Sequence, residues 1–210
     1  MSAEITTGVR SVLSKPTVYE LFSRAIGGHR ARMRLVREHL RIAPGSRVLD
    51  VGCGPGELLS YLGDVQYVGI DISASYVKRA RKRFAARTAE FFVGDATSIP
   101  TEMGDFDVAV ATGVMHHLDD AQVREMVGGI AEALKLDGRF ICLENAVVPG
   151  QHRIARAIIA RDRGQHVRSP EGYAELAGTA FGSVHATIRH DLLRIPYTHC
   201  VLECREPAGS

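Results

Sequence analysis

The sequence predicts an α/β fold in which helices cover both faces of a parallel sheet. Five short apolar runs, each bounded by turn residues, alternate with helical patterns; they cover residues 46–52, 66–71, 89–95, 106–112 and 139–145. Strands that are apolar along their whole length are typical of a parallel sheet buried on both faces. The first run leads into a glycine-rich turn, and two further strand-like runs close the chain. Together these observations favour a doubly wound sheet.

Two of the connections between the runs carry a clear helical stripe. The first follows Ser73, a candidate N-cap. Its apolar face is formed by Val77, Ala80 and Phe84. The second follows Asp119 and Asp120, which suit a helix start because they oppose its positive dipole end. Its stripe is formed by Val123, Met126, Val127, Ile130 and Leu134. Asp137-Gly138 then turns the chain into the fifth run.

We expect one domain over residues 1–210, divided into four parts. These are N-terminal helices at 1–45, the alternating core at 46–145, an insertion at 146–182 and a terminal hairpin at 183–210. In the first part, one helix is expected from Pro16 to Gly27-Gly28. The second is expected to carry Met33, Val36 and Leu40 on one face.

The insertion and the hairpin follow the fifth run. A helix is indicated by Ile154, Ala155, Ile158 and Ile159. Ser169-Pro170 fits the cap and first position of another helix. The runs 185–193 and 198–205 predict two antiparallel strands that a short turn through Pro196 connects.

Composition argues against several classes of protein. A net charge of +2 does not indicate a nucleic-acid binder or a membrane-surface protein. No apolar run reaches the about 18 residues of a membrane span, and the start lacks the apolar core of a secretory signal. The four cysteines lack zinc-finger spacing. Cys200 and Cys204 would lie about 13 Å apart in a strand, beyond the about 7 Å limit for a disulfide. We expect reduced thiols, a cytoplasmic location and no metal.

Glycines alternate in the turn after the first run, which reads VLDVGCGPGEL from residue 48 to 58. Gly52, Gly54 and Gly56 permit positive φ and close approach of a ligand to the main chain, at the edge where open α/β sheets bind ligands. The dinucleotide fingerprint requires glycine where Glu57 stands, and an acid there would repel a pyrophosphate. The P-loop pattern is absent as well. The turn therefore favours a nucleoside ligand without phosphates.

Two acids at strand ends fit the same ligand. Asp71 ends the second run and can accept hydrogen bonds from both ribose hydroxyls. The neighbouring Ile72 can lie on an adenine ring. Asp95 follows the third run, where it can accept a hydrogen bond from an adenine amino group. The alternative is that both carboxylates only cap the helices that follow them.

This combination resembles the class I, Rossmann-like methyltransferases that depend on S-adenosylmethionine. The matching segments are VLDVGCGPGELL (48–59), YVGIDIS (67–73), FFVGDA (91–96), FDVAVATGVMHHL (106–118) and LKLDGRFICLE (134–144). Later segments are similar to bacterial small-molecule methyltransferases of unassigned substrate. The resemblance implies a seven-stranded, mostly parallel sheet with an antiparallel last strand. It also implies a helical cap, formed by the N-terminus and by the insertion after strand five.

The resemblance further implies a set of residues around S-adenosylmethionine. They are Asp50, Gly52, Cys53, Gly54, Asp71, Ile72, Asp95, Ala96, Thr112 and Gly113. In the family, the glycine loop approaches the methionine end and the acid before it steadies the loop. The second-strand acid holds the ribose, and the pair after strand three holds the adenine. The pair after strand four closes the site beneath the methionine part.

The pair His116-His117 stands just past the fourth run, where the family often places a residue near the transferable methyl. A neutral histidine can take the proton from a substrate hydroxyl, and we favour His116 for this role. The alternative is that one ring packs against the cofactor and the other faces solvent. Methyltransferases often need only proximity and alignment.

The segment 151–168 is rich in arginine. Its isoleucines are expected to be buried, which leaves Arg153, Arg156, Arg161 and Arg163 to face outward or into a cleft. Arginine clusters bind phosphates and carboxylates bidentately, so they favour an anionic substrate. The alternative is a solvated helix face. Tyr19, with Phe22, is a candidate for the opposite wall of the substrate site, although such aromatics are more often part of a core.

These patterns predict a methyltransferase that acts on an oxygen or nitrogen of a small metabolite, with S-adenosylhomocysteine as its product. Methylation of RNA or protein is one alternative. The Asn/Asp-Pro-Pro-aromatic motif, which family members that act on planar nitrogens carry, is absent after strand four. A non-catalytic protein that binds S-adenosylmethionine is the other alternative. A homodimer through the helices at either end is an arrangement that the sequence allows.

Overall fold

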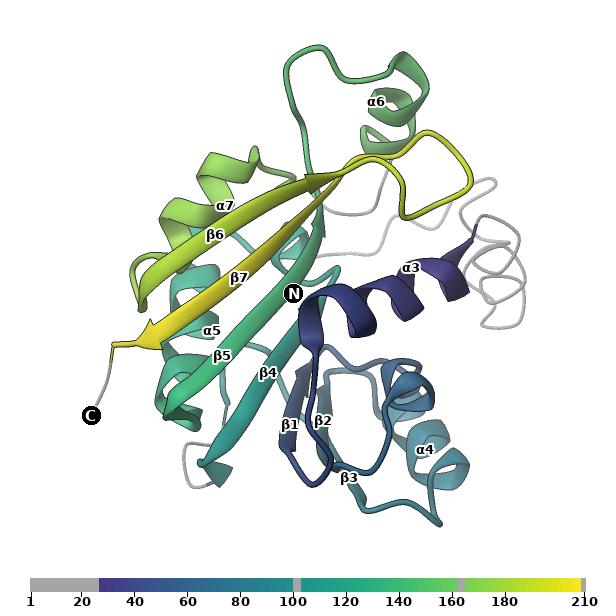
Figure 1. The fold of residues 1–210 in the computed structure, drawn as a ribbon, viewed down its shortest axis with the longest axis vertical. Helices are drawn as coiled ribbons and strands as arrows, with labels where there is room; N and C mark the ends of the chain where they lie inside the picture. The colour runs from purple at the N-terminus through teal and green to yellow at the C-terminus, as the bar shows by residue number, and fades with distance from the viewer. Residues whose placement is uncertain (1–26, 100–102, 162–164, 209–210) are drawn as a thin grey trace.

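A computed structural model describes residues 27–99, 103–161 and 165–208 of the chain, built around one seven-stranded sheet (Figure 1). The strand order is β3-β2-β1-β4-β5-β7-β6. The strands are β1 (Arg47–Val51), β2 (Gln66–Asp71), β3 (Ala89–Val93), β4 (Phe106–Thr112), β5 (Leu134–Asn145), β6 (Phe181–Arg189) and β7 (His199–Pro207). Strands β1 to β5 pair in parallel, and β7 is antiparallel to both β5 and β6. The predicted fold class and the antiparallel last strand are confirmed.

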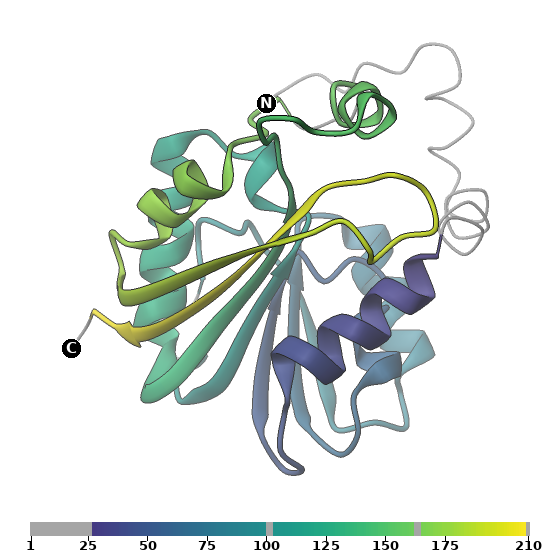
Figure 2. The ribbon, with the colours of Figure 1, turned by 45° about the horizontal axis from the view of Figure 1, so that its top comes forward.

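The helical elements lie on both faces of the sheet. They are α3 (Gly28–Arg34), the π-helix η1 (Leu35–Leu40), the 3₁₀ helices η2 (Leu58–Tyr61) and η4 (Met115–His117), α4 (Ala74–Arg83), α5 (Asp120–Ala133), α6 (Arg153–Ile159) and α7 (Pro170–Ala177). Helices α5 and α7 pack on one face, and α4 packs with η1 and η2 on the other (Figures 1 and 2). No helix among the described residues is long and apolar enough to span a bilayer.

The predicted helix caps are present. Ser73 Oγ accepts a hydrogen bond from Tyr76 N at the start of α4. Asp119 begins α5 with a capping box, in which Gln122 N donates to Asp119 Oδ1 at 2.9 Å and Asp119 N donates back to the Gln122 side chain. Ser169 caps α7, and Pro170 occupies its first turn. These local signals set where the helices begin.

The apolar face predicted for the second N-terminal helix is wrong at Met33, which is 47% exposed. The buried residues of this segment include Ala31, Leu35 and Leu40, at spacings of four and five. The chain passes from an α-helix into the π-helix η1, so the buried face follows a wider spacing than 3.6 residues. Gly27 is the N-cap of α3, with φ of 98°. The helix predicted from Pro16 lies outside the described residues.

Two further boundaries differ from the sequence prediction. Strand β5 begins at Leu134, and residues 135–138 bulge from it between the pairs Phe106–Leu134 and Val108–Arg139. The bulge carries Lys135, whose Nζ lies 2.6 Å from Asp107 Oδ1. Strand β6 ends at Arg189, so residues 190–198 form a longer connection than the short turn predicted. Asp191 leaves the sheet there to pair with Arg189 and with Arg34 of α3.

Candidate functional site

The glycine loop after β1 needs its glycines for geometry. Gly52, Gly54 and Gly56 have φ of 72°, 53° and 75°, a region that side chains disfavour. A Cβ on Gly52 would collide with the Val114 side chain, whereas a Cβ on Gly54 would meet no atom within 4 Å. The Gly52 N–H and the buried Cys53 N–H both donate to Ile70 O of β2. The loop is thus held against β2 with its middle glycine facing open space.

Asp71 connects the end of β2 to this loop. Its Oδ2 accepts a hydrogen bond from Gly54 N, and its Oδ1 accepts one from Ser73 N, each at 2.8 Å. The alternative that Asp71 only caps the following helix therefore accounts for one of its two carboxylate oxygens. The carboxylate is half-buried, and Ile72 beside it is 73% exposed. The Asp71 carboxylate, which can accept hydrogen bonds, and the exposed apolar side chain of Ile72 lie next to the main chain of Gly54, which carries no side chain. This arrangement fits a ribose and an adenine ring.

Asp50 lies under the loop, at 1% exposure. Tyr67 donates its hydroxyl to Asp50 Oδ2, while Oδ1 is buried without a hydrogen-bond partner among the described residues. Burial raises the pKa of this carboxyl to about 7. The bond that the structure shows runs to β2, so the role of Asp50 in steadying the glycine loop stays a prediction.

Asp95 follows β3 and is exposed. Its Oδ1 accepts hydrogen bonds from Thr97 N at 3.0 Å and Thr97 Oγ1 at 2.9 Å. This is a local turn, and no helix begins among residues 96–99 for Asp95 to cap. Contact of Asp95 and Ala96 with an adenine ring therefore stays a prediction.

The end of β4 brings a histidine to the glycine loop. Gly113 follows Thr112 with φ of 70°, and its N–H donates to Leu143 O at 2.8 Å. A Cβ on Gly113 would lie 3.5 Å from His116 Cε1. Since Val114 contacts Gly52, the loops after β1 and β4 and the His116 ring meet at one place.

Glu144, near the end of β5, fixes that histidine and was missed by the sequence analysis. Its side chain is 1% exposed. Glu144 Oε1 accepts hydrogen bonds from Val114 N and Met115 N, each at 2.8 Å, and Oε2 lies 2.6 Å from His116 Nδ1. An acid near the end of an apolar strand was the available signal, and it is the same signal that marks Asp50 and Asp71.

His116 and His117 differ in environment. His116 is buried, at 6% exposure, whereas His117 is exposed, with the two ring centroids 4.1 Å apart. One ring is therefore buried in the site and the other faces solvent, as the alternative expected. The Glu144 contact makes His116 the stronger catalytic candidate, and the role itself is untested.

Arg168, from the insertion after β5, clamps the segment that carries His116. Its guanidinium donates to Met115 O and Leu118 O at 2.9 Å, and it forms an ion pair with Asp120. The His166 N–H also donates to His116 O at 3.1 Å. The sequence analysis did not single out Arg168 among the arginines of this segment, and it holds protein backbone.

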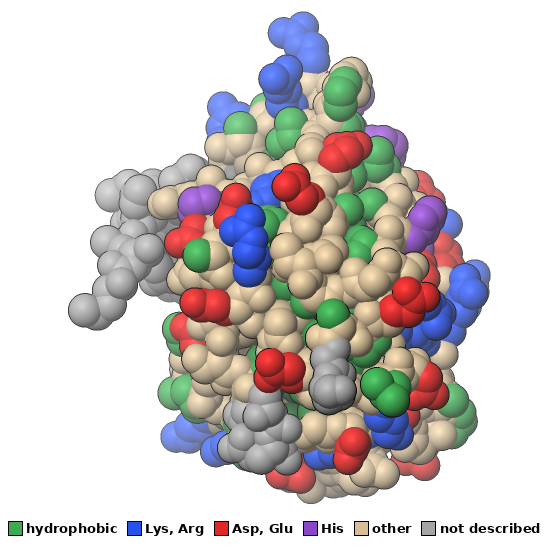
Figure 3. All heavy atoms as spheres, turned by 90° about the vertical axis from the view of Figure 1, so that its left-hand side faces the viewer, with side chains coloured by type: hydrophobic (Ala, Val, Ile, Leu, Met, Phe, Trp, Pro, Cys, Tyr) green, Lys and Arg blue, Asp and Glu red, His purple; other side chains and the backbone are tan. Residues whose placement is uncertain are grey.

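Of the arginine candidates, Arg153 and Arg156 lie on α6, and Arg161 follows it. Arg153 and Arg156 are exposed, and basic side chains gather at the top of Figure 3, where Figure 1 places α6. The expectation that the isoleucines mark the buried side is wrong at Ile154, which is 53% exposed. Ala155 and Ile159 are buried instead, because the short helix turns those two positions inward. Arg163 and Tyr19 lie outside the described residues.

All four cysteines are buried, unpaired thiols. Within the described part of the chain, no group of three or more His, Cys, Asp or Glu side chains is arranged to hold a metal ion.

The strand order and the loops place a nucleoside-type site at the carboxyl edge of the sheet. Residues 48–138 match the protein family described as "Methyltransferase domain". Residues 48–138 thus carry a methyltransferase domain. The methyltransferase match covers the glycine loop, Asp71, Asp95, and both histidines.

Similar proteins support this assignment. The uncharacterized methyltransferase sll0829 of Synechocystis is 30% identical over 133 residues, which are 61% of this chain and 63% of that protein. The chain thus spans less than two thirds of that relative's length. Phosphoethanolamine N-methyltransferase 2 of Haemonchus contortus has a TM-score of 0.74 at 16% identity, over 94% of this chain and 58% of that one. A TehB-like methyltransferase of Corynebacterium glutamicum has a TM-score of 0.64 at 19% identity, over 94% and 100%. Such structural likeness shows the fold alone.

Proposed function

We propose that this chain transfers a methyl group from S-adenosylmethionine to a hydroxyl oxygen of a small metabolite. The observation that carries the proposal is the buried contact of Glu144 with His116 Nδ1, 2.6 Å long, beside Gly113 and the glycine loop. This contact fixes the His116 imidazole, a potential proton acceptor, close to the glycine loop, where the family binds the methionine end of its cofactor.

The residues around the glycine loop fit the cofactor. Gly54 leaves room for a ligand against the main chain. The buried Asp50 Oδ1 has no hydrogen-bond donor among the described residues and could accept a hydrogen bond from a ligand. Asp71 and Ile72 would hold the ribose and the adenine ring, and Asp95 would hold the adenine amino group. When bound, S-adenosylmethionine supplies an electrophilic methyl group on a positively charged sulfur.

Glu144 determines which nitrogen of His116 is basic. Its carboxylate already accepts two backbone N–H groups on Oε1, so Oε2 acts as an acceptor and Nδ1 must carry the shared proton. The lone pair of neutral His116 then lies on Nε2, where it can take the proton of an acceptor hydroxyl. A hydroxyl gains more from such a base than an amine, which attacks with its own lone pair. This favours oxygen over nitrogen.

The protein's remaining tasks are alignment and exclusion of water. We propose that the insertion after β5 covers the acceptor, because Arg168 ties it to the segment that holds His116. An anionic acceptor held by Arg153 and Arg156 stays a prediction. The four unpaired thiols support a reducing, cytoplasmic location.

The test uses purified protein, methyl-labelled S-adenosylmethionine and a fractionated cell extract. We compare the wild type with Asp71→Ala and with Asp64→Ala, an exposed acid outside the site. Loss of a charged hydrogen-bond acceptor is expected to lower small-molecule labelling by about tenfold or more in Asp71→Ala, and Asp64→Ala is expected to match the wild type.

Two outcomes would contradict the proposal. Label confined to RNA or protein would replace the small metabolite by a macromolecule. Binding of S-adenosylmethionine without any transfer would favour a non-catalytic binding protein. Circular dichroism of each variant checks that the fold is intact.

A further inference from the structure

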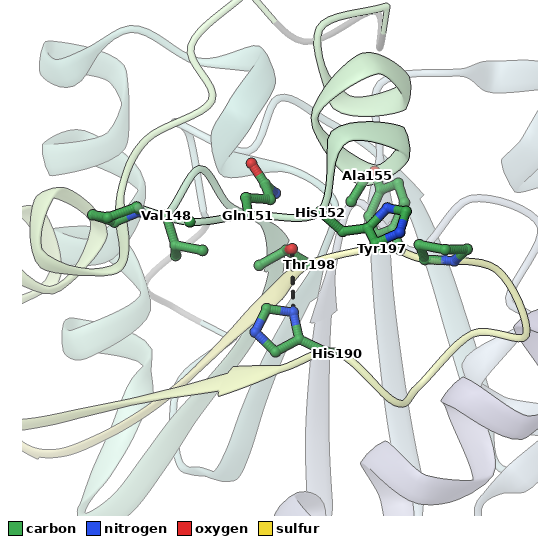
Figure 4. Close-up of a pocket in the computed structure, with 10 residues that line it drawn as sticks. Val148, Gln151, His152, Ala155, His190, Tyr197 and Thr198 are labelled. Atoms are coloured by element: carbon green, nitrogen blue, oxygen red, sulfur yellow. Dashed lines mark hydrogen bonds between the residues drawn. The ribbon is translucent and has the colours of Figure 1, made fainter.

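A cavity of about 330 Å³ lies between the insertion after β5 and the connection from β6 to β7. One wall comes from residues 148–152 and Ala155, and the other from His190 and residues 196–198. Figure 4 shows the two segments facing each other, with Gln151 and His152 on one side and His190 and Thr198 on the other. The cavity is therefore built from segments that lie far apart in the sequence.

The cavity lies at the same sheet edge as Glu144. Asn145 ends β5 and pairs with His199 at the start of β7. Ala146 N donates to Thr198 O at 3.1 Å. Thr198 lines the cavity, so this hydrogen bond joins the cavity wall to a residue two positions after Glu144. Val147 N donates to Arg168 O, and the Arg168 side chain holds the backbone beside His116. The cavity walls are thus linked to the catalytic candidate through short backbone contacts.

The described lining of the cavity holds rings and small polar groups, and none of the permanently charged side chains. Among the described residues that line it, there is no arginine, lysine, aspartate or glutamate. Rings dominate instead, from His152, His190, Pro149, Pro196 and Tyr197, with an apolar floor from Val148 and Ala155. The polar groups are the His152 and His190 imidazoles, the Tyr197 hydroxyl, the Gln151 amide and the Thr198 hydroxyl, which lies 3.3 Å from His190 Nδ1. Flat apolar walls with a few hydrogen-bonding groups are typical of small-molecule sites.

The size of the cavity points to a ring system. An apolar cavity of about 150 Å³ holds benzene, so this one has room for two fused rings with substituents. The rings of Tyr197 and His199 pack at a tilt of 44°, with 4.7 Å between their centroids. Burial lowers the pKa of His199 to about 4, which keeps that neighbouring ring neutral at physiological pH. A planar, uncharged ligand matches this surface, because aromatic faces bind one another without desolvating a charge.

We propose that the methyl acceptor is an uncharged, planar aromatic alcohol bound in this cavity. The proposal rests on the function proposed above and narrows its substrate class. The acceptor oxygen forms a bond to the methyl carbon as the carbon–sulfur bond of the sulfonium breaks. The hydroxyl proton passes to His116 Nε2, and S-adenosylhomocysteine leaves as a neutral thioether. The exposed arginines of α6 then have no part in acceptor binding.

The probes are 2-naphthol and 6-hydroxy-2-naphthoate, which share a ring system and differ by one carboxylate. Because the chain has no tryptophan, naphthol fluorescence reports binding directly, in the presence of S-adenosylhomocysteine. Transfer is measured separately with methyl-labelled cofactor. We expect 2-naphthol to bind and to be methylated, and the carboxylate to bind at least about tenfold more weakly, since no arginine or lysine in the described lining compensates its desolvation.

Matched variants locate the ligand. Val148→Phe narrows the cavity and is expected to weaken 2-naphthol binding by about tenfold or more, whereas Val147→Phe alters an exposed neighbour outside the lining and leaves it unchanged. Tyr197→Leu removes one ring wall and serves as a second test should Val148→Phe misfold. Affinity for S-adenosylmethionine is expected to stay constant in all three variants.

The outcomes separate this inference from the proposed function. Preference for the carboxylate, lost in Arg153→Ala/Arg156→Ala, would overturn the inference and assign the acceptor to the arginines. Equal binding of 2-naphthol by wild type, Val148→Phe and Tyr197→Leu would also overturn it. Naphthol binding that needs the cavity, without methylation of any acceptor, would support the cavity as a ring site while contradicting the methyl transfer.

Discussion

The two halves of the sheet edge are built in different ways. On the β1–β2 side, the site consists of backbone with positive φ at Gly52 and Gly54 and of an acid at the end of its own strand. On the β4–β5–β7 side, it depends on side chains from distant segments, as when Glu144 holds the loop after β4. A cofactor common to a family can be bound by local backbone geometry. An acceptor site particular to one chain needs long-range contacts.

The largest effect is expected in the β4–β5–β7 half of the site, from Glu144→Gln. The amide oxygen can still accept the Val114 and Met115 N–H groups, but its NH₂ then faces His116 Nδ1. The ring proton is forced onto Nε2, so His116 loses its role as base. We expect kcat to fall about 10²- to 10³-fold, with cofactor affinity unchanged.

The matched control for this variant is Glu132→Gln, on the exposed side of α5. Steady-state kinetics and calorimetric titration with S-adenosylmethionine provide the two readouts. An unchanged kcat in Glu144→Gln would show that Glu144 has a structural role alone and that alignment suffices for transfer.

The β1–β2 half of the site is tested by Gly52→Ala. The new Cβ would collide with Val114, and φ of 72° is strained for alanine. Strain of this kind corresponds to a loss of about 100-fold or less in affinity, so we expect S-adenosylmethionine binding to weaken by about that factor. Gly63→Ala is the control, since its Cβ meets no atom within 4 Å. Calorimetry that finds equal affinity for both variants would mean that the loop does not contact the cofactor.

Positioning within the β4–β5–β7 half is tested by Arg168→Lys. Lysine keeps the charge but cannot hold Met115 O, Leu118 O and Asp120 together, because it lacks the planar fork of arginine. Small displacements of a catalytic group are costly, and we expect kcat to fall about tenfold. Arg37→Lys, an exposed change on η1, is expected to leave kcat unaltered. Equal kinetics of the two variants would contradict a positioning role for Arg168.

The same division explains what the sequence could predict. Strands 66–71 and 106–112 were predicted with the bounds that the structure has, because continuous apolar runs and flanking turns are local signals. The caps at Ser73, Asp119 and Ser169 are local as well. The positive φ of the glycines follows from the residue type. These features needed no knowledge of partners elsewhere in the chain.

The features that were missed depend on packing. Glu144 could be recognised as a strand-end acid, but only the pairing of β4 with β5 shows that it faces the loop after β4. Arg168 was not among the residues that the sequence analysis singled out, because its carbonyl partners cannot be read from the sequence. The exposure of Met33 follows from a π-helix, whose wider spacing breaks the expected period. Side-chain partners across the sheet therefore set the limit of the sequence prediction.

The smallest effect is expected far from the chemistry, where Asp191 joins the connection of β6 to β7 to α3. Hydrogen bonds from Arg189 and then Arg34 hold the pKa of Asp191 well below its usual range. A lowered pKa in the folded state means that the stabilisation is present above the unfolded value of about 4 and is lost as pH falls below it. Because the carboxylate is half-exposed, Asp191→Asn is expected to lower Tm by only about 1–3 °C at pH 7.

That difference in Tm is expected to shrink as the pH is lowered toward 3, because Asp191 of the unfolded chain takes up its proton there while the folded carboxylate stays ionised. Thermal denaturation at pH 7, 5 and 3 measures it, with Asp64→Asn as an exposed control that lacks a salt bridge in the described structure. A Tm difference that stays constant over this range would mean that Asp191 acts through packing and not through charge. Residues of the 190–198 connection also line the acceptor cavity. A constant Tm difference would therefore also mean that the charge of the Asp191–Arg34 ion pair does not hold this cavity wall against α3.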